Sequence, residues 1–317
     1  MINESKKHWR SVISQPVDVA DFRPLSSALA VEVAAASVCG RLRPHNTDHY
    51  LAIRFGRLQE TIVTSLAAAD LPPRFEEYAY AMLVADGLDE SGAGVRASRV
   101  ALSTLAKLAI RYGRWNVRAD PETLADIVEQ GEFFYRRAND EVLRASKTDL
   151  ALTDMATSLT ALYIAEGDLI FAHVGHSKAF LFRNGSLTQL TRDHTLEQSQ
   201  PRSAGSRPPE RPKADYRHFV TRSIGGDPAG PDVEIEHVKL SAGDRLLLCT
   251  NGLTDVVGRD PIADTLALQR PPHDDCQQLI DLARAAGSPD DVTVMVADYR
   301  LRSDTATTQR PSPLATG

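Results

Sequence analysis

The order of predicted elements in this 317-residue chain favours an α+β fold, a β-sandwich of two antiparallel sheets flanked by helices. A strand-like apolar run precedes two helical patterns, short strands joined by tight turns follow, and a short helix precedes the last strand. An apolar fraction of 42%, with 6% aromatic residues, is ordinary for a globular core. The prediction therefore depends on the arrangement of the elements and not on composition.

The two helices follow from residue spacing. After an apolar run at 80–85, small and apolar residues recur at three- and four-residue steps, which places them on one helix face. These residues are Val95, Ser98, Leu102, Leu105 and Ala109. Asp120 and Pro121 then supply an N-cap and a proline at the first helical position, so a second helix is expected from there to about residue 142.

A meander of four short strands is predicted after the helices. The turns at 166–168 and at Asn184-Gly185 are typical of hairpins. A helix at 274–286 and a strand at 292–299 complete the pattern. The four strands of the meander are residues 159–165, 168–174, 178–183 and 187–191.

One domain is predicted over residues 28–301, with an extension at 1–27 and a Thr-, Ser- and Pro-rich disordered tail at 302–317. Two internal stretches have no assigned role. Residues 54–80 are longer than a minimal hairpin needs, and loops of such length are usually functional or mobile. Residues 198–216 are polar, proline-rich and basic, which suits a flap or a plain mobile loop.

Charge and cysteine usage limit the function classes. The net charge of -6 gives no reason to expect nucleic acid or a membrane surface as a partner. Cys39, Cys249 and Cys276 are isolated, so neither a disulfide framework nor a zinc site is indicated. No signal-peptide core and no run of about 18 apolar residues occurs, and a cytoplasmic location is expected.

The most informative short segment is VADGLDESGAG, with Asp86 and Gly87 at its centre. A strand that ends in Asp-Gly delivers a carboxylate and an open backbone carbonyl to a sheet edge. Both oxygens suit a hard metal ion. Asp-Gly is also the commonest hairpin dipeptide, so a plain turn is the alternative interpretation of these two residues alone.

Four further segments occur in an order that resembles one enzyme family. Arg43 precedes Asp48 by five residues, and downstream the sequence reads DMATSLTALYIAEGDLIFAHVGHSKAF, then GDRLLLCTNGLTDVV, then SPDDVTVMVADY. Together these segments resemble the bacterial form of the metal-dependent type 2C protein serine/threonine phosphatases, the PPM type. There they read approximately R-x-x-N-[EQ]-D, VADGMGG, GTT with VGDSRAY, LCSDGLTD and DNITV. The resemblance covers residues 28–301 and implies the same sandwich, with a metal site at one end.

The resemblance also implies roles for the matched residues. Asp86 would bridge two metal ions, Asp48 would orient metal-bound water, and Arg43 would bind the substrate phosphate through its planar guanidinium. The implied cofactors are two divalent cations, Mn²⁺ or Mg²⁺, which make water a nucleophile for phosphomonoester hydrolysis. The expected catalytic residues are Arg43, Asp48 and Asp86, and the expected metal-site residues are Asp48, Asp86, Gly87, Asn251 and Asp290.

Departures from the family pattern put full activity in doubt. Asn251 and His176 stand where the family has aspartates, so an outer third metal site is lost or altered. The lost charge at Asn251 lowers the expected metal affinity, whereas His176 either binds manganese, iron or zinc or has a structural role. The acids at 89–90, which replace two glycines, either compensate for the lost charge or face solvent. The other departures are Thr47, for Glu or Gln, and Asp291, for Asn.

Two functions follow from the resemblance. The first is hydrolysis of phosphoserine and phosphothreonine in a phosphoprotein substrate of a serine/threonine kinase. The alternative is a catalytically impaired relative that binds phosphoproteins or partners without turnover, motivated by Asn251 and His176. A nucleotide-binding or kinase function is not indicated, because the sequence has no GxxxxGK[ST] or GxGxxG run.

Overall fold

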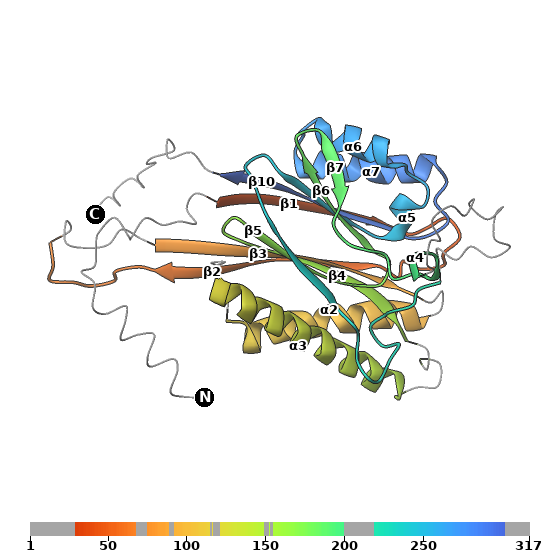
Figure 1. The fold of residues 1–317 in the computed structure, drawn as a ribbon, viewed down its shortest axis with the longest axis horizontal. Coiled ribbons are helices and arrows are strands. Elements are labelled where there is room, and N and C mark those ends of the chain that lie inside the picture. Colours follow the sequence, from red (N-terminus) through yellow and green to blue (C-terminus); the bar gives the residue numbers. More distant parts are fainter. Residues whose placement is uncertain are drawn as a thin grey trace, which may run out of the picture.

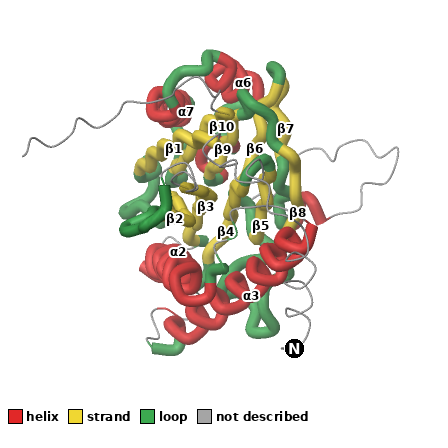
Figure 2. The backbone as a smooth tube through the Cα atoms, turned by 90° about the vertical axis from the view of Figure 1, so that its left-hand side faces the viewer, coloured by secondary structure: helices red, strands yellow, loops and turns green. Residues whose placement is uncertain are grey.

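The computed structural model describes residues 29–67, 75–88, 92–114, 116, 121–148, 152, 155–199 and 219–301. In these residues two five-stranded antiparallel sheets pack face to face, and helices cover both outer faces (Figures 1 and 2). The predicted α+β sandwich is therefore confirmed. The extension at 1–27, the tail at 302–317 and most of the 198–216 segment lie outside the described residues.

Each sheet combines segments that are far apart in the sequence. The first sheet has the order β1 (Leu29–Val38), β10 (Val292–Leu301), β9 (Arg245–Cys249), β6 (Lys178–Arg183), β7 (Ser186–Gln189). The second has the order β2 (His49–Gln59), β3 (Phe75–Gly87), β4 (Thr157–Ala165), β5 (Asp168–Val174), β8 (Glu234–Lys239).

The helices form two outer layers, seen edge-on in Figure 2. Below the second sheet lie α2 (Gly92–Tyr112) and α3 (Pro121–Ser146). Above the first sheet lie α6 (Arg259–Ala267) and α7 (Pro272–Ala285). Two short helices, α4 (Leu196–Ser199) and α5 (Asn251–Thr254), lie in connections. None of the described helices combines the length and apolar character needed to cross a bilayer.

The strand β3 shows why an apolar run forms a central strand here. Successive side chains point to opposite faces. Met82 and Val84 are buried between the two sheets, whereas Leu83 and Ala85 are buried against the helix layer of α2 and α3. Because both faces are covered, the strand reads as a continuous apolar run and not as an alternation.

The tight turns have the backbone conformation that their residues favour. Between β6 and β7, Asn184 has φ 52° and Gly185 has φ 79°. Positive φ at both central positions is the pattern of a type I′ hairpin turn, for which Asn-Gly is the preferred pair. The predicted hairpins β4–β5 and β6–β7 are present. The prediction of one continuous meander was wrong, because β5 and β6 belong to different sheets.

The expectation of a long loop at 54–80 was wrong at both ends of that stretch. β2 and β3 pair from His49 opposite Ala85 to Gln59 opposite Phe75, so residues 54–59 and 75–80 are strand. β2 lacks a continuous apolar run and exposes alternate residues, because it is the edge strand of its sheet. Side-chain pattern therefore gave a weak signal there.

Candidate functional site

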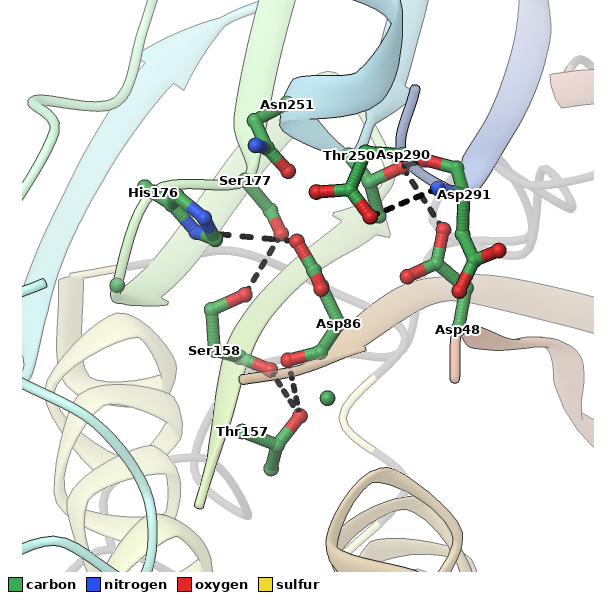
Figure 3. Close-up of polar contacts among 12 residues, drawn as sticks. Asp48, Asp86, Thr157, Ser158, His176, Ser177, Thr250, Asn251, Asp290 and Asp291 are labelled. Carbon is green, nitrogen blue, oxygen red and sulfur yellow. Dashed lines mark hydrogen bonds and ion pairs between the residues drawn. The ribbon is translucent and has the colours of Figure 1, made fainter. Parts of the chain in front are cut away.

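The predicted site residues meet at one end of the sandwich. Asp86 and Gly87 end β3, and Asn251 follows β9. Asp48 lies directly before β2, and Asp290 lies two residues before β10. Figure 3 shows these side chains together, with contributions from both sheets. Their approach follows from antiparallel pairing, since the end of one strand lies beside the beginning of the next.

Asp48 connects the two sheets. Its Oδ2 accepts hydrogen bonds from Thr250 Oγ1 at 2.9 Å and from Thr293 Oγ1 at 2.8 Å, both on the first sheet. Its Oδ1 is buried and accepts no hydrogen bond from the described residues. Burial raises the pKa of Asp48 to about 7; the two hydroxyls oppose this, and the nearby Asp290 and Asp291 add to it. An ionised Asp48 therefore calls for a positive charge beside it.

Asp86 is a second buried carboxylate in the site. It is 6% exposed, and its Oδ2 accepts no hydrogen bond from the described residues. Burial is the main cause that raises its pKa well above the ordinary value; Asp48 and Asp290 add to the shift, and Arg43 opposes it. His176 Nδ1 lies 3.8 Å from Oδ2, as Figure 3 shows.

Gly87 is required by the close approach of helix α2. A Cβ atom at this position would lie 2.5 Å from the backbone of Gly94, so no larger residue fits without moving the helix. The main chain next to it is held by Thr157, whose Oγ1 donates to the carbonyl oxygen of Asp86 at 2.8 Å. The Gly87 carbonyl itself accepts only a long contact of 3.3 Å from Thr47 Oγ1.

Asn251 presents an oxygen to the site. Its amide nitrogen donates to Asp255 Oδ2 at 3.0 Å, which fixes the orientation of the amide. Its Oδ1 is buried and accepts no hydrogen bond from the described residues. Asn251 therefore presents a neutral oxygen to the site where the family pattern has a carboxylate.

Arg43 and Asp290 form an ion pair that the sequence did not predict. Arg43 Nε donates to Asp290 Oδ1 at 2.7 Å, and the backbone N–H of Asp291 donates to the same oxygen at 2.8 Å. The residue expected to bind phosphate thus pairs with a residue expected to bind metal. The two expected roles are therefore coupled, because an ion at Asp290 would compete with the guanidinium.

Asp291 has a structural role that was not predicted from the sequence. Oδ1 accepts from the backbone N–H of Gly40 at 2.8 Å. Oδ2 accepts from the N–H of Thr47 at 2.7 Å and from its hydroxyl at 2.9 Å. These bonds hold the loop that carries Arg43 and Asp48. The adjacent acids Asp290 and Asp291 were the sequence signal for this role, because Asp291 is the one that bonds to the loop.

Behind the site, His173 is part of the scaffold. Its Nδ1 pairs with Thr160 Oγ1 at 2.8 Å and its Nε2 with the carbonyl oxygen of Gly175 at 3.0 Å. Burial lowers the pKa of His173 to about 3, so the ring is neutral and Nε2 donates to the carbonyl. This bond supports Gly175, which has a φ of +116° and directly precedes His176.

The oxygen atoms of the site suit a divalent cation, although they do not form a complete set of ligands. Asp48 Oδ1, Asp86 Oδ2 and Asn251 Oδ1 are buried oxygens without hydrogen-bond donors among the described residues. Oxygen ligands of this kind are what Mg²⁺ and Mn²⁺ bind. Within the described ranges no three or more His, Cys, Asp or Glu side chains already stand at metal-binding distance. Asp290 is held by Arg43, and residues 89–90 lie outside those ranges.

Comparison with known proteins identifies the family of this chain. The family model described as "Protein phosphatase 2C" matches residues 74–283. The serine/threonine protein phosphatase PstP of Mycobacterium tuberculosis is 32% identical over 217 residues, 68% of this chain. The protein phosphatase PhpP of Streptococcus pneumoniae is 30% identical over 214 residues, 67% of this chain and 83% of PhpP. The chain spans only 40% of the length of PstP.

Solved structures give the same result for the fold. The crystal structure of PstP has a TM-score of 0.62 and 28% identity, and covers 85% of this chain and 99% of that one. The catalytic domain of PstP in complex with two manganese ions has a TM-score of 0.61 and 28% identity, with 86% and 99% covered. The sandwich described above is therefore the PPM phosphatase fold.

Proposed function

Because the chain belongs to the protein phosphatase 2C family, we propose that it is a metal-dependent hydrolase of phosphoserine and phosphothreonine in proteins. One observation supports this most directly. Three buried oxygens, on Asp48, Asp86 and Asn251, meet at one end of the sandwich without hydrogen-bond donors among the described residues. Buried acceptors in this state are costly unless a cation neutralises them.

The residues present divide the work between metal binding and phosphate binding. Asp86, Asp48 and the Gly87 carbonyl, joined by Asn251 and Asp290, would hold two divalent ions, Mn²⁺ or Mg²⁺. Such ions supply a nucleophilic water and a positive field over the phosphoryl oxygens. The related PstP catalytic domain crystallised with two manganese ions. The threonine hydroxyls that fix Oδ2 of Asp48 leave its other oxygen to orient water in this site.

Arg43 would recognise the phosphate. Its Nε is bonded to Asp290, and its side chain is 16% exposed at the rim of the site. An ion held by Asp290 would compete with this contact and would leave the Arg43 guanidinium to donate to phosphate oxygens. Its planar fork suits two oxygens at once.

A catalytically impaired relative is the second candidate, on the observation that Asn251 and His176 occupy acidic positions of the family. The neutral amide removes one full charge next to a divalent ion. In that case the protein would bind phosphoproteins without turnover. The phosphatase remains the better proposal because Asp86, Asp48 and Asp290 lie together in Figure 3 and Arg43 contacts Asp290.

Turnover and metal stoichiometry test the proposal. We expect the purified chain to release phosphate from a phosphothreonine peptide with Mn²⁺ and to stop when a chelator is added. Calorimetric titration with Mn²⁺ should give two ions per chain. Peptide binding without phosphate release would identify the impaired relative, and absence of both would reject a phosphatase site. Residues 28–301 are the proposed catalytic domain, and the cytoplasm is its proposed location.

A further inference from the structure

A cavity of about 130 Å³ lies between the helices α2 and α3 and the outer face of the second sheet, away from the metal site. We infer that this cavity binds an uncharged molecule with a single aromatic ring. Protein interiors are close-packed and seldom retain voids much larger than a water molecule. A space of this size therefore needs an explanation.

Strand register explains why the space exists. One row of side chains crosses all five strands, because Leu83 lies opposite Ala161 and Ala161 lies opposite Ala172. The row has large residues at its edges and alanines at its centre, and all its members line the cavity. They are Leu51, Leu83, Ala161, Ala172 and Ile235.

The helices also carry small residues where they face the cavity. Ala106 and Ala109 of α2 and Gly131 of α3 line the cavity. A Cβ atom at Gly131 would lie 3.3 Å from Ile235, a tight contact, so the glycine lets α3 pack closely against the sheet beside the cavity. Small residues on both layers at the same place create the void.

The chemistry of the walls excludes a charged ligand. Among the described residues that line the cavity, none is Lys, Arg, His, Asp or Glu. Three polar side chains are already bonded to backbone oxygens: Tyr135 Oη to Ala172 at 2.8 Å, Tyr163 Oη to Asn116 at 2.6 Å and Gln130 Nε2 to Tyr112 at 2.9 Å. An occupant therefore needs no hydrogen bond, and a charge buried here would lack a partner.

Size and wall geometry favour an aromatic ring. An apolar cavity of about 150 Å³ in another protein stays dry and binds benzene. Here the rings of Phe55 and Tyr163, with centroids 6.2 Å apart and planes tilted by 43°, form part of the wall. Tilted aromatic walls offer edges and faces to a further ring. Ile53, Ile127 and Ala161 are partly exposed, which gives access from solvent.

Thermal unfolding and calorimetry with toluene test the inference, with benzoate as the charged probe of the same ring. We expect toluene to raise the Tm by about 2–5 °C at tenfold excess over its dissociation constant, and benzoate to leave it unchanged. Ala161→Leu should fill the cavity and weaken toluene binding at least tenfold. Ala285→Leu, on an exposed face of α7, should bind toluene like the wild type.

A second filling variant, Ala106→Leu on the helix side, decides the matter if Ala161→Leu does not fold. Loss of toluene binding in a folded filling variant, with retention in Ala285→Leu, supports the site. The inference is rejected if toluene does not bind the wild-type protein. It is also rejected if toluene binds a folded filling variant as tightly as the wild type.

Discussion

Charged side chains are buried at both ends of strand β9, but they are stabilised in different ways. At its first residue, Arg245 is 1% exposed and pairs with Asp275, which is 0% exposed, at 2.6 Å. Arg270 adds a second bond to Asp275 at 3.0 Å. Beyond its last residue, Asp48 and Asp86 each bury one oxygen that accepts no hydrogen bond from the described residues. The first cluster brings its own counter-charge, whereas the second requires one from outside.

This difference distinguishes buried charges that stabilise the fold from buried charges that we expect to bind a metal ion. A buried pair with its partner holds elements together and becomes costly only when one member is removed. Buried carboxylates without a partner destabilise the chain until a cation arrives. Substitutions in the cluster at the first residue of β9 should therefore lower stability, whereas substitutions in the site beyond its last residue should lower activity.

The largest effect on activity is expected at Asp86. Asp86→Ala removes the ligand shared by both ions and should lower phosphate release at least about a hundredfold, because a two-metal site loses both functions together. Calorimetry should show most Mn²⁺ binding lost. The metal-free Tm should stay the same or rise, since a buried carboxylate is removed.

Asp140→Ala, on an exposed part of α3, is the control and should keep activity and metal binding. A folded Asp86→Ala variant with more than a few per cent of wild-type activity would move the reaction to another site. A large drop in its metal-free Tm would contradict the contrast between the two ends of β9.

The largest effect on stability is expected at the other end. Asp275→Ala leaves Arg245 buried without its main partner and should lower the free energy of unfolding by about 3–5 kcal/mol, measured by urea denaturation. Asp274→Ala, one residue earlier and exposed in the first turn of α7, should cost about 0.3–1 kcal/mol through the helix dipole. Equal losses in the two variants would show that the buried pair has no special role.

The fold was more predictable from sequence than the contacts of the site. β5 and β6 begin and end where the apolar runs do, and α3 begins at Pro121, because burial and turn chemistry are local properties. β8, by contrast, is an edge strand with mostly polar residues, and it was not predicted. Its two apolar residues, Ile235 and Val238, are three positions apart, so the alternation that marks a half-buried strand is missing.

The site residues were predicted by type and order, but their pairing was not. The ion pair between Arg43 and Asp290 joins positions 247 residues apart, and the clamp of Asp291 on Thr47 spans a similar distance. Such contacts depend on how two sheets close on each other. The cavity above Ala161 and Ala172 likewise needs strand register, which a single sequence does not specify.

Arg43 gives a smaller effect that separates phosphate binding from metal binding. Arg43→Ala should lower kcat/KM for a phosphopeptide at least about tenfold, because a charge-assisted contact contributes about 1.5–3 kcal/mol. Mn²⁺ affinity should be unchanged or tighter, since Asp290 loses its competing partner. Arg41→Ala, exposed two residues earlier, should have no effect. The reverse result would show that Arg41 carries the phosphate contact.

The smallest effect is expected at Asn251. Asn251→Asp restores a charge beside the second ion and should lower the Mn²⁺ concentration for half-maximal phosphate release a few-fold. The metal-free protein should become less stable, because the amide donor to Asp255 is replaced by a like charge about 3.0 Å away. Mn²⁺ should reverse that loss, whereas Asn251→Ala should raise the Mn²⁺ requirement. If Asn251→Asp leaves the requirement unchanged, another acid already supplies the charge, and the neutral amide is not what limits metal binding.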